Sequence, residues 1–116
     1  MYYNYDMEIR KLDIKEVIEA LKNKNKFKDV VIEAIEYLIN KEKNSGVIII
    51  EVRELASIVK EMLNLKSNKY NKRIEVKVGL ALKDLGIQTF RAGIENRKEF
   101  VISRTEFEMI KNANKK

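Results

Sequence analysis

The chain has 116 residues, a length that fits one domain with a single hydrophobic core. It contains neither cysteine nor histidine, which excludes disulfides and thiolate metal sites and removes the commonest general base. Basic side chains outnumber acidic ones by 24 to 18, so the formal net charge is +6. We therefore expect a protein that is not an enzyme and that uses no metal and no cofactor.

The apolar runs are too short for a membrane segment. None approaches the roughly 20 residues that a transmembrane helix needs, and residues 1–11 lack the apolar core of a signal peptide. We expect a cytoplasmic protein with no membrane partner. Lysine and glutamate dominate the charged residues and glutamine is almost absent, as is typical of thermophiles. The many asparagines argue against a thermophilic source, so both origins stay open.

Two amphipathic helices are predicted at the start of the chain. The first covers residues 12–22, where Asp13 and Glu16 have the spacing of a capping box. Its apolar stripe consists of Leu12 or Ile14, followed by Val17, Ile18 and Leu21. After a polar turn at 23–26, the second helix covers residues 27–43. Its apolar face holds Phe27, Val30 or Val31, Ala34, Ile35, Leu38 and Ile39.

A short strand and a third helix follow. Residues 44–46 have the composition of a turn, and the β-branched residues 47–50 predict a strand. Residues 51–65 return to helical spacing. The polar residues 66–71 then form a turn, in which Ser67 or Asn68 is suited to cap the next helix.

The segment after this turn fits two structures. Its residues 74–78 alternate as in a strand, and Gly79 weakens a helix by about 1 kcal/mol relative to alanine. The helical period nevertheless continues to Leu85, and Gly86 is suited to end a helix. We predict a helix that begins between Ser67 and Lys72, in which Gly79 allows a neighbouring helix to approach closely. Its apolar positions are Ile74, Val78, Ala81, Leu82 and Leu85.

A β-hairpin and a final helix complete the chain. Strands at 87–91 and 98–103 are joined by residues 92–97, where Gly93 and Asn96 are most able to adopt positive φ. Residues 104–112 predict a helix, which Ser103 or Thr105 caps, followed by a frayed tail. The aromatic residues at apolar-periodic or strand positions are expected in the core: Phe27, Tyr37, Phe90, Phe100 and Phe107.

The positive charge is concentrated in one part of the chain. Residues 66–98 hold nine basic and three acidic side chains, a net charge of +6. Residues 1–65 carry a net charge of −1 and residues 99–116 a net charge of +1. Lysines spread over a surface serve solubility, whereas a local excess indicates a polyanionic partner.

The order helix, strand, helix, helix and two-stranded hairpin in residues 27–103 resembles a winged-helix domain, a helix-turn-helix variant with a β-hairpin wing. The stretch VGLALKDLGIQTFR, residues 78–91, is similar to the junction between the last helix and the wing in many such domains. The resemblance implies a mainly α, α+β fold in a single domain, 1–116. The winged-helix module would cover 27–103, with an N-terminal helical extension at 1–26 and a C-terminal helix and tail at 104–116. The composition resembles that of small archaeal or archaeal-virus proteins.

The resemblance implies binding of double-stranded DNA, as a transcriptional regulator associated with the nucleoid. The helix at 68–85 would enter the major groove and the wing at 87–103 would lie on the backbone. The linker before this helix is longer than a tight helix-turn-helix turn, and the wing lacks an aromatic residue at its tip. Carried over by position, the DNA-binding residues are Asn68, Lys69, Tyr70, Lys72, Arg73, Lys77, Arg91, Arg97 and Lys98.

Each of these side chains also has a structural interpretation. Arg73 is the best candidate to pair with guanine, or it forms a salt bridge with Glu75 or Glu51. Tyr70 donates a hydrogen bond to a phosphate, or its ring packs on the core. The cations expected either to contact phosphates or to form a solvated surface are Lys69, Lys72, Arg91, Arg97 and Lys98.

The terminal segments suggest a homodimer that reads two half-sites, or they cover their own core. The apolar residues available there are Tyr2, Tyr3, Tyr5, Phe107 and Ile110. Two other functions stay open: a protein-interaction subunit of a transcription or replication complex, and an RNA-binding module. Acidic pairs such as Glu33/Glu36 and Glu51/Glu54 are expected on solvent-exposed helix faces and not in a catalytic site.

Overall fold

The computed structural model describes residues 8–42 and 46–114, which form an α+β fold. Within these residues, helices and a small three-stranded antiparallel sheet confirm the α+β class expected from the sequence. The elements in chain order are α1 (Ile14–Lys22), α2 (Lys24–Lys41), β1 (Val47–Glu51), α3 (Val52–Met62), the 3₁₀ helix η1 (Asn68–Tyr70), α4 (Asn71–Asp84), β2 (Phe90–Ala92), β3 (Arg97–Ser103) and α5 (Arg104–Ala113).

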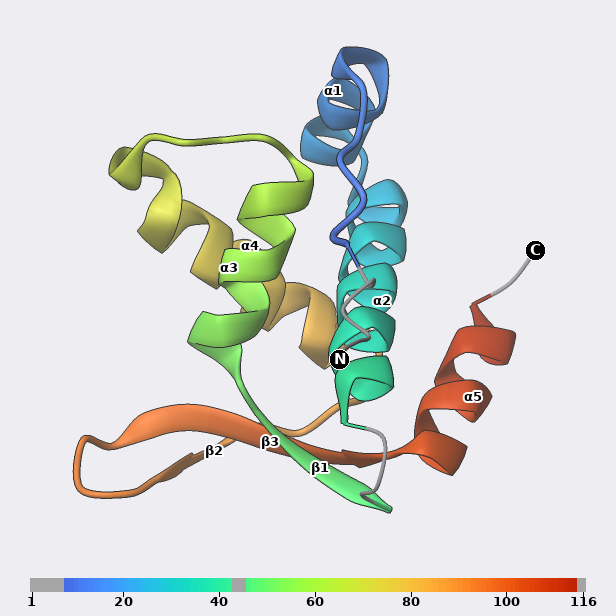
Figure 1. Ribbon diagram of the computed structural model, residues 1–116, viewed down its shortest axis with the longest axis vertical. Coiled ribbons are helices and arrows are strands. Elements are labelled where there is room, and N and C mark those ends of the chain that lie inside the picture. The colour runs from blue at the N-terminus through green and yellow to red at the C-terminus, as the bar shows by residue number, and fades with distance from the viewer. Residues whose placement is uncertain (1–7, 43–45, 115–116) are drawn as a thin grey trace, which may run out of the picture.

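The sheet lies at one end of the helical layer (Figure 1). Its strand order is β1-β3-β2, so the central strand, β3, pairs with both others. The inner face presents buried Ile48 and Ile50 from β1 and Phe100 and Ile102 from β3. α3 packs against β3 and α4. The β2–β3 hairpin extends beyond α3 at the lower left of Figure 1, and α5 lies on the other side of α2.

One hydrophobic core joins all the helices and the sheet. α2 supplies the largest share, and Leu12 and Ala20 from the N-terminal extension belong to the same cluster. Of the two alternatives at the start of the first stripe, Leu12 is the buried one. The expected burial of Ile18 is wrong, because α1 turns Val17, Ala20 and Leu21 toward α2 and leaves Ile18 exposed.

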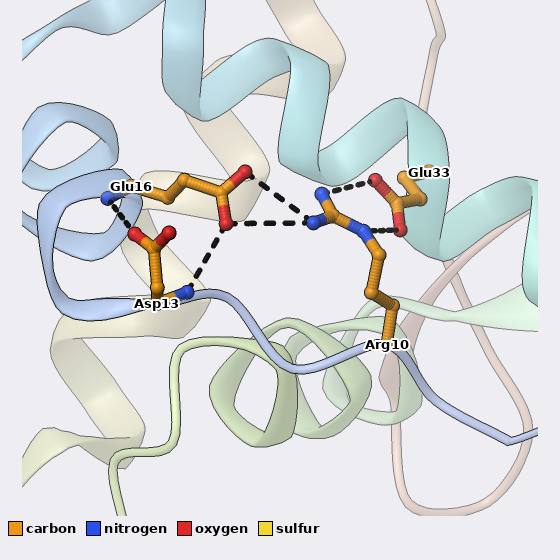
Figure 2. A network of polar contacts seen from close by, with 4 residues as sticks. All are labelled: Arg10, Asp13, Glu16 and Glu33. Carbon is orange, nitrogen blue, oxygen red and sulfur yellow. Dashed lines mark hydrogen bonds and ion pairs between the residues drawn. The ribbon is translucent and has the colours of Figure 1, made fainter.

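An arginine ties the segment before α1 to two helices. The Arg10 guanidinium donates Nε to Glu33 Oε2 at 2.7 Å and Nη2 to Glu33 Oε1 at 2.9 Å, and it also contacts Glu16 (Figure 2). These hydrogen bonds, above all those that Arg10 donates to Glu33, raise the pKa of Arg10 above its ordinary value. Glu16 also completes the predicted capping box with Asp13, whose carboxylate accepts the Glu16 N–H at 2.8 Å.

Two helix boundaries differ from the sequence prediction by three residues, and the others by two or fewer. The expected turn at 23–26 is the first turn of α2, because the Asn23 side chain accepts the N–H groups of Asn25 and Lys26. At the other end of the third helix, α3 stops at Met62 and not at Leu65. Asn64 adopts a φ of 58°, and the chain closes the helix there with backbone hydrogen bonds.

The ambiguous segment is helical, as predicted, and η1 and α4 begin within the expected interval. Gly86 has a φ of 81°, and the Ile87 N–H donates to the Leu82 carbonyl at 2.9 Å. This bond closes a Schellman motif. Because it commits the backbone at Ile87 to the helix end, the strand predicted at 87–91 starts only at Phe90.

The hairpin turn and the last helix follow the sequence closely. Gly93 and Asn96 both have positive φ, as predicted. Ser103 is the N-cap of α5 and forms a capping box with Glu106. The expected core position of Phe90 is wrong: it lies opposite Glu99 on the outer face of the sheet, away from the helices, and is exposed. Tyr2, Tyr3 and Tyr5 lie outside the described residues, whereas Phe107 is buried and Ile110 packs against the same core.

Candidate nucleic-acid interface

A broad groove runs between α4, the β2–β3 hairpin and the start of α3, with a volume of about 1090 Å³. Basic side chains from all three pieces line it, against two carboxylates, Glu75 and Glu95. The basic ones are Arg53, Lys72, Lys83, Arg91, Arg97 and Lys98. The groove therefore gathers cations that lie far apart in the sequence onto one concave surface.

The groove side of α4 follows from its helical period. Lys72, Val76, Gly79 and Lys83 recur every three or four residues, so they share one side of the helix. The buried positions, Ile74 and the other predicted core residues of this helix, lie on the opposite side. α4 thus presents lysine near both ends of its groove side, with Glu75 and an apolar stretch between them.

The hairpin contributes two like charges that face each other directly. Arg91 of β2 is the cross-strand partner of Lys98 of β3, and both line the groove. Like charges at directly opposed positions of a sheet are destabilising. Among the described residues, neither has a carboxylate oxygen within 4.0 Å; Arg91 Nη1 instead donates to the Asn96 carbonyl at 3.0 Å. The pair therefore carries an unneutralised charge that an anion would relieve.

Arg97 differs from its neighbours because its charge is already balanced. Its guanidinium contacts Glu95 and reaches Glu51 Oε1 at 3.3 Å. Glu95, and then Glu51, raise the pKa of Arg97 above its ordinary value. Arg97 therefore ties the turn end of the hairpin to the end of β1, and its positive charge is less available to an anion than that of Arg91 or Lys98.

Two predicted residues lie on the other side of α4. The Lys77 ammonium sits 5.6 Å from the centre of the Phe27 ring, in a small pocket beside α2. Arg73 is one turn earlier on the same side of the helix, exposed and outside the groove lining. Its alternative salt bridges to Glu75 or Glu51 are absent from the described part of the chain, where Glu51 pairs with Arg97.

The remaining predicted residues form η1, ahead of α4 and outside the groove lining. Tyr70 is half-buried and packs against the core, the structural alternative for this ring. The Lys69 ammonium lies 5.4 Å from the centre of the same ring. Asn68 and Lys69 are exposed at the N-terminal side of α4. The structure therefore brings four of the nine predicted residues into the groove: Lys72, Arg91, Arg97 and Lys98.

Two groove cations were missed by the sequence assignment. Lys83 carried a detectable signal, because it lies three helical turns after Lys72 on the same side of α4. Arg53 carried none. It reaches the groove because β1 pairs with β3, which places the start of α3 beside the base of the hairpin.

Outside the groove, several carboxylates have structural partners. Glu33 binds Arg10, and Glu36 Oε2 accepts a hydrogen bond from Lys111 Nζ at 2.9 Å, which raises the pKa of that lysine. Residues 8–42 and 46–114 contain no cluster of three acidic, histidine or cysteine side chains arranged to hold a metal ion. Over the same residues, no helix combines the length and apolarity needed to cross a membrane.

Comparison with family models, curated proteins and solved structures found no match to this chain. The function is therefore inferred from the groove itself. Its lining combines cations on both walls with an apolar stretch on α4 and two carboxylates, Glu75 and Glu95, a composition suited to an anionic ligand.

Proposed function

We propose that this chain is a double-stranded DNA-binding protein of winged-helix architecture, acting as a transcriptional regulator in the cytoplasm. α4 enters the major groove and the β2–β3 hairpin lies along the backbone. The opposed Arg91 and Lys98 carry the proposal. An arrangement that costs free energy in the isolated protein gains it back when phosphates lie against the pair.

The spread of the basic side chains favours duplex DNA over a small anion as the ligand of the groove. The cations come from α3, from both ends of the groove side of α4 and from the hairpin, so they spread over the whole groove. A single phosphate would occupy one part of it, whereas a duplex presents two lines of phosphates with base edges between them. An α-helix has the diameter that the major groove admits.

The test is binding to mixed-sequence duplex DNA over a series of salt concentrations. Five groove cations lie more than 4.0 Å from every carboxylate of the described residues: Arg53, Lys72, Lys83, Arg91 and Lys98. If each neutralises one phosphate, the logarithm of the binding constant falls against the logarithm of salt with a slope of about −4.5. A slope near zero would contradict the proposal.

A protein partner is the second candidate, favoured by one observation. Val76 and Leu80 are exposed in the middle of the groove, where a protein ligand would bury them. Such a ligand would carry acidic residues around an apolar ridge. If the chain is a protein-interaction subunit, we expect it to bind every duplex weakly throughout the salt series.

The proposal includes a homodimer, because duplex-binding modules of this size commonly read two half-sites related by a two-fold axis. The outer face of the sheet presents exposed Val47, Ile49 and Val101, the last two directly paired. We expect sedimentation equilibrium to give twice the chain mass, and Ile49→Glu to give the monomer mass. A monomer in the unaltered protein would contradict this part of the proposal.

A further inference from the structure

The groove side of α4 carries two exposed apolar side chains next to Glu75. Val76 is 54% exposed and Leu80 is 56% exposed, and their spacing of four residues puts them on adjacent turns of the same side. Lys72 precedes them by one turn and Lys83 follows within one turn. The helix thus offers two apolar side chains with a lysine before and after them, and one carboxylate, Glu75, beside Val76.

Gly79 lies between these two side chains in the groove lining, and the fold does not require a glycine there. A Cβ added at Gly79 would meet nothing within 4 Å, so the expected close approach of a neighbouring helix is wrong. Glycine in a helix interior is destabilising relative to alanine. The missing side chain lowers the helix surface on the groove side, which lets an external molecule approach the backbone closely.

We infer that Val76 and Leu80 recognise thymine by contacting its C5-methyl group in the major groove, and that the missing side chain of Gly79 lets the base edges approach the helix backbone. This inference rests on the proposed DNA binding. Thymine is the one standard base that presents an apolar group in the major groove. On a duplex, base edges lie between two phosphate lines. The apolar centre of α4 therefore matches the bases and its terminal lysines match the backbones.

The decisive probe is a duplex that differs only in this methyl group. Duplexes selected for binding from a random-sequence pool are remade with deoxyuridine in place of thymidine, which keeps base pairing and phosphates and removes the methyl. We expect thymine enrichment in the selected pool. We also expect the deoxyuridine copy to bind about fourfold more weakly for each contacted methyl group. Val76→Ala/Leu80→Ala should bind both copies equally.

The matched control is Ile14→Ala/Ile18→Ala on α1. These isoleucines are also exposed and four residues apart, but they lie on a helix remote from the hairpin (Figure 1). The control variant should keep the preference for thymidine. If the control variant loses the preference for thymidine as fully as Val76→Ala/Leu80→Ala does, the assignment of Val76 and Leu80 is overturned.

Gly79→Ala supplies a second measurement that does not depend on base composition. Alanine favours the helix, so the midpoint of thermal unfolding should rise. The added Cβ should at the same time weaken binding to the selected duplex roughly tenfold, since it obstructs a close contact. A variant that is more stable and binds with undiminished affinity would overturn the role of Gly79.

The outcomes separate this inference from the proposed function. Salt-dependent duplex binding with equal affinity for thymidine and deoxyuridine overturns thymine reading and leaves DNA binding intact. Binding to no duplex, together with binding to an acidic amphipathic peptide that Val76→Ala/Leu80→Ala abolishes, overturns both and assigns the groove to a protein.

Discussion

Replacing Arg91 and Lys98 together by glutamine is expected to weaken duplex binding roughly a hundredfold, taking about 1.5 kcal/mol for each lost charge-assisted contact. The loss should be the same for every DNA sequence, because the contacts are to phosphates. The salt slope should become shallower by about 1.8, the share of two phosphates. Titrating one duplex at several salt concentrations measures both effects.

The same double variant should not lose stability. Arg91 and Lys98 repel each other across β2 and β3, and opposed like charges destabilise a sheet by a few tenths of a kcal/mol. Urea unfolding should therefore give a free energy of unfolding equal to or slightly above that of the unaltered protein. Weaker DNA binding then reflects the lost charges and not a damaged fold.

The control for charge number is Lys11→Gln/Lys15→Gln, which removes two exposed lysines just before and at the start of α1, a helix that lies far from the hairpin (Figure 1). It lowers the net charge of the chain by the same amount. If this control loses affinity as strongly as the hairpin variant, DNA binding depends on overall charge and the groove is not the interface.

The helices could be predicted from the sequence because their apolar period is regular. α4 shows this best: Ile74, Val78 and Leu82 recur at helical spacing, and all three are buried. The helix boundaries were harder to predict, since they depend on single polar side chains. Asn23 starts α2 earlier than the apolar pattern does, and Asn64 ends α3 before the pattern does.

Which residues line the candidate interface could not be predicted from the sequence, because it depends on tertiary structure. The local charge of residues 66–98 directed attention to a segment that supplies most of the groove cations, but a count of charges does not say which side of a helix each one occupies. Lys72 and Lys83 lie on the groove side of α4, whereas Lys77 lies against Phe27. Arg97 has the same charge as Lys98 but is balanced by Glu95 and by Glu51, and Glu51 belongs to β1, which is far from Arg97 in the sequence.

Apolar residues in the groove illustrate a further limit of reading periodicity alone. Val76 and Leu80 fall between the buried positions of α4, and sequence reasoning passed over them because they are neither core nor charged. Their exposure becomes informative only when Gly79 and the terminal lysines are found on the same side of the helix. In the proposed DNA-binding function, base preference is therefore expected to depend on residues that carry no charge.

Truncating Phe100 to alanine is expected to have the largest effect on stability, about 3–5 kcal/mol. Phe100 is fully buried on β3, the central strand, directly opposite Ile50 of β1. Removing its ring leaves a cavity where the sheet meets the helical layer. A domain of this size is stable by only about 5–15 kcal/mol, so much of the protein's stability is lost. Urea unfolding followed by circular dichroism measures the change.

Phe90→Ala is the matched control, because it makes the same substitution on the neighbouring strand. Phe90 is 45% exposed on the outer face of the sheet, so its loss should cost about 1 kcal/mol or less. Equal losses in the two variants would contradict the assignment of the inner and outer faces. The position of the hairpin charges depends on the same assignment, since β3 carries Phe100 into the core and, two residues earlier, Lys98 into the groove. We therefore expect Phe100→Ala to weaken the proposed duplex binding as well as the fold, whereas Phe90→Ala should leave the hairpin anchored.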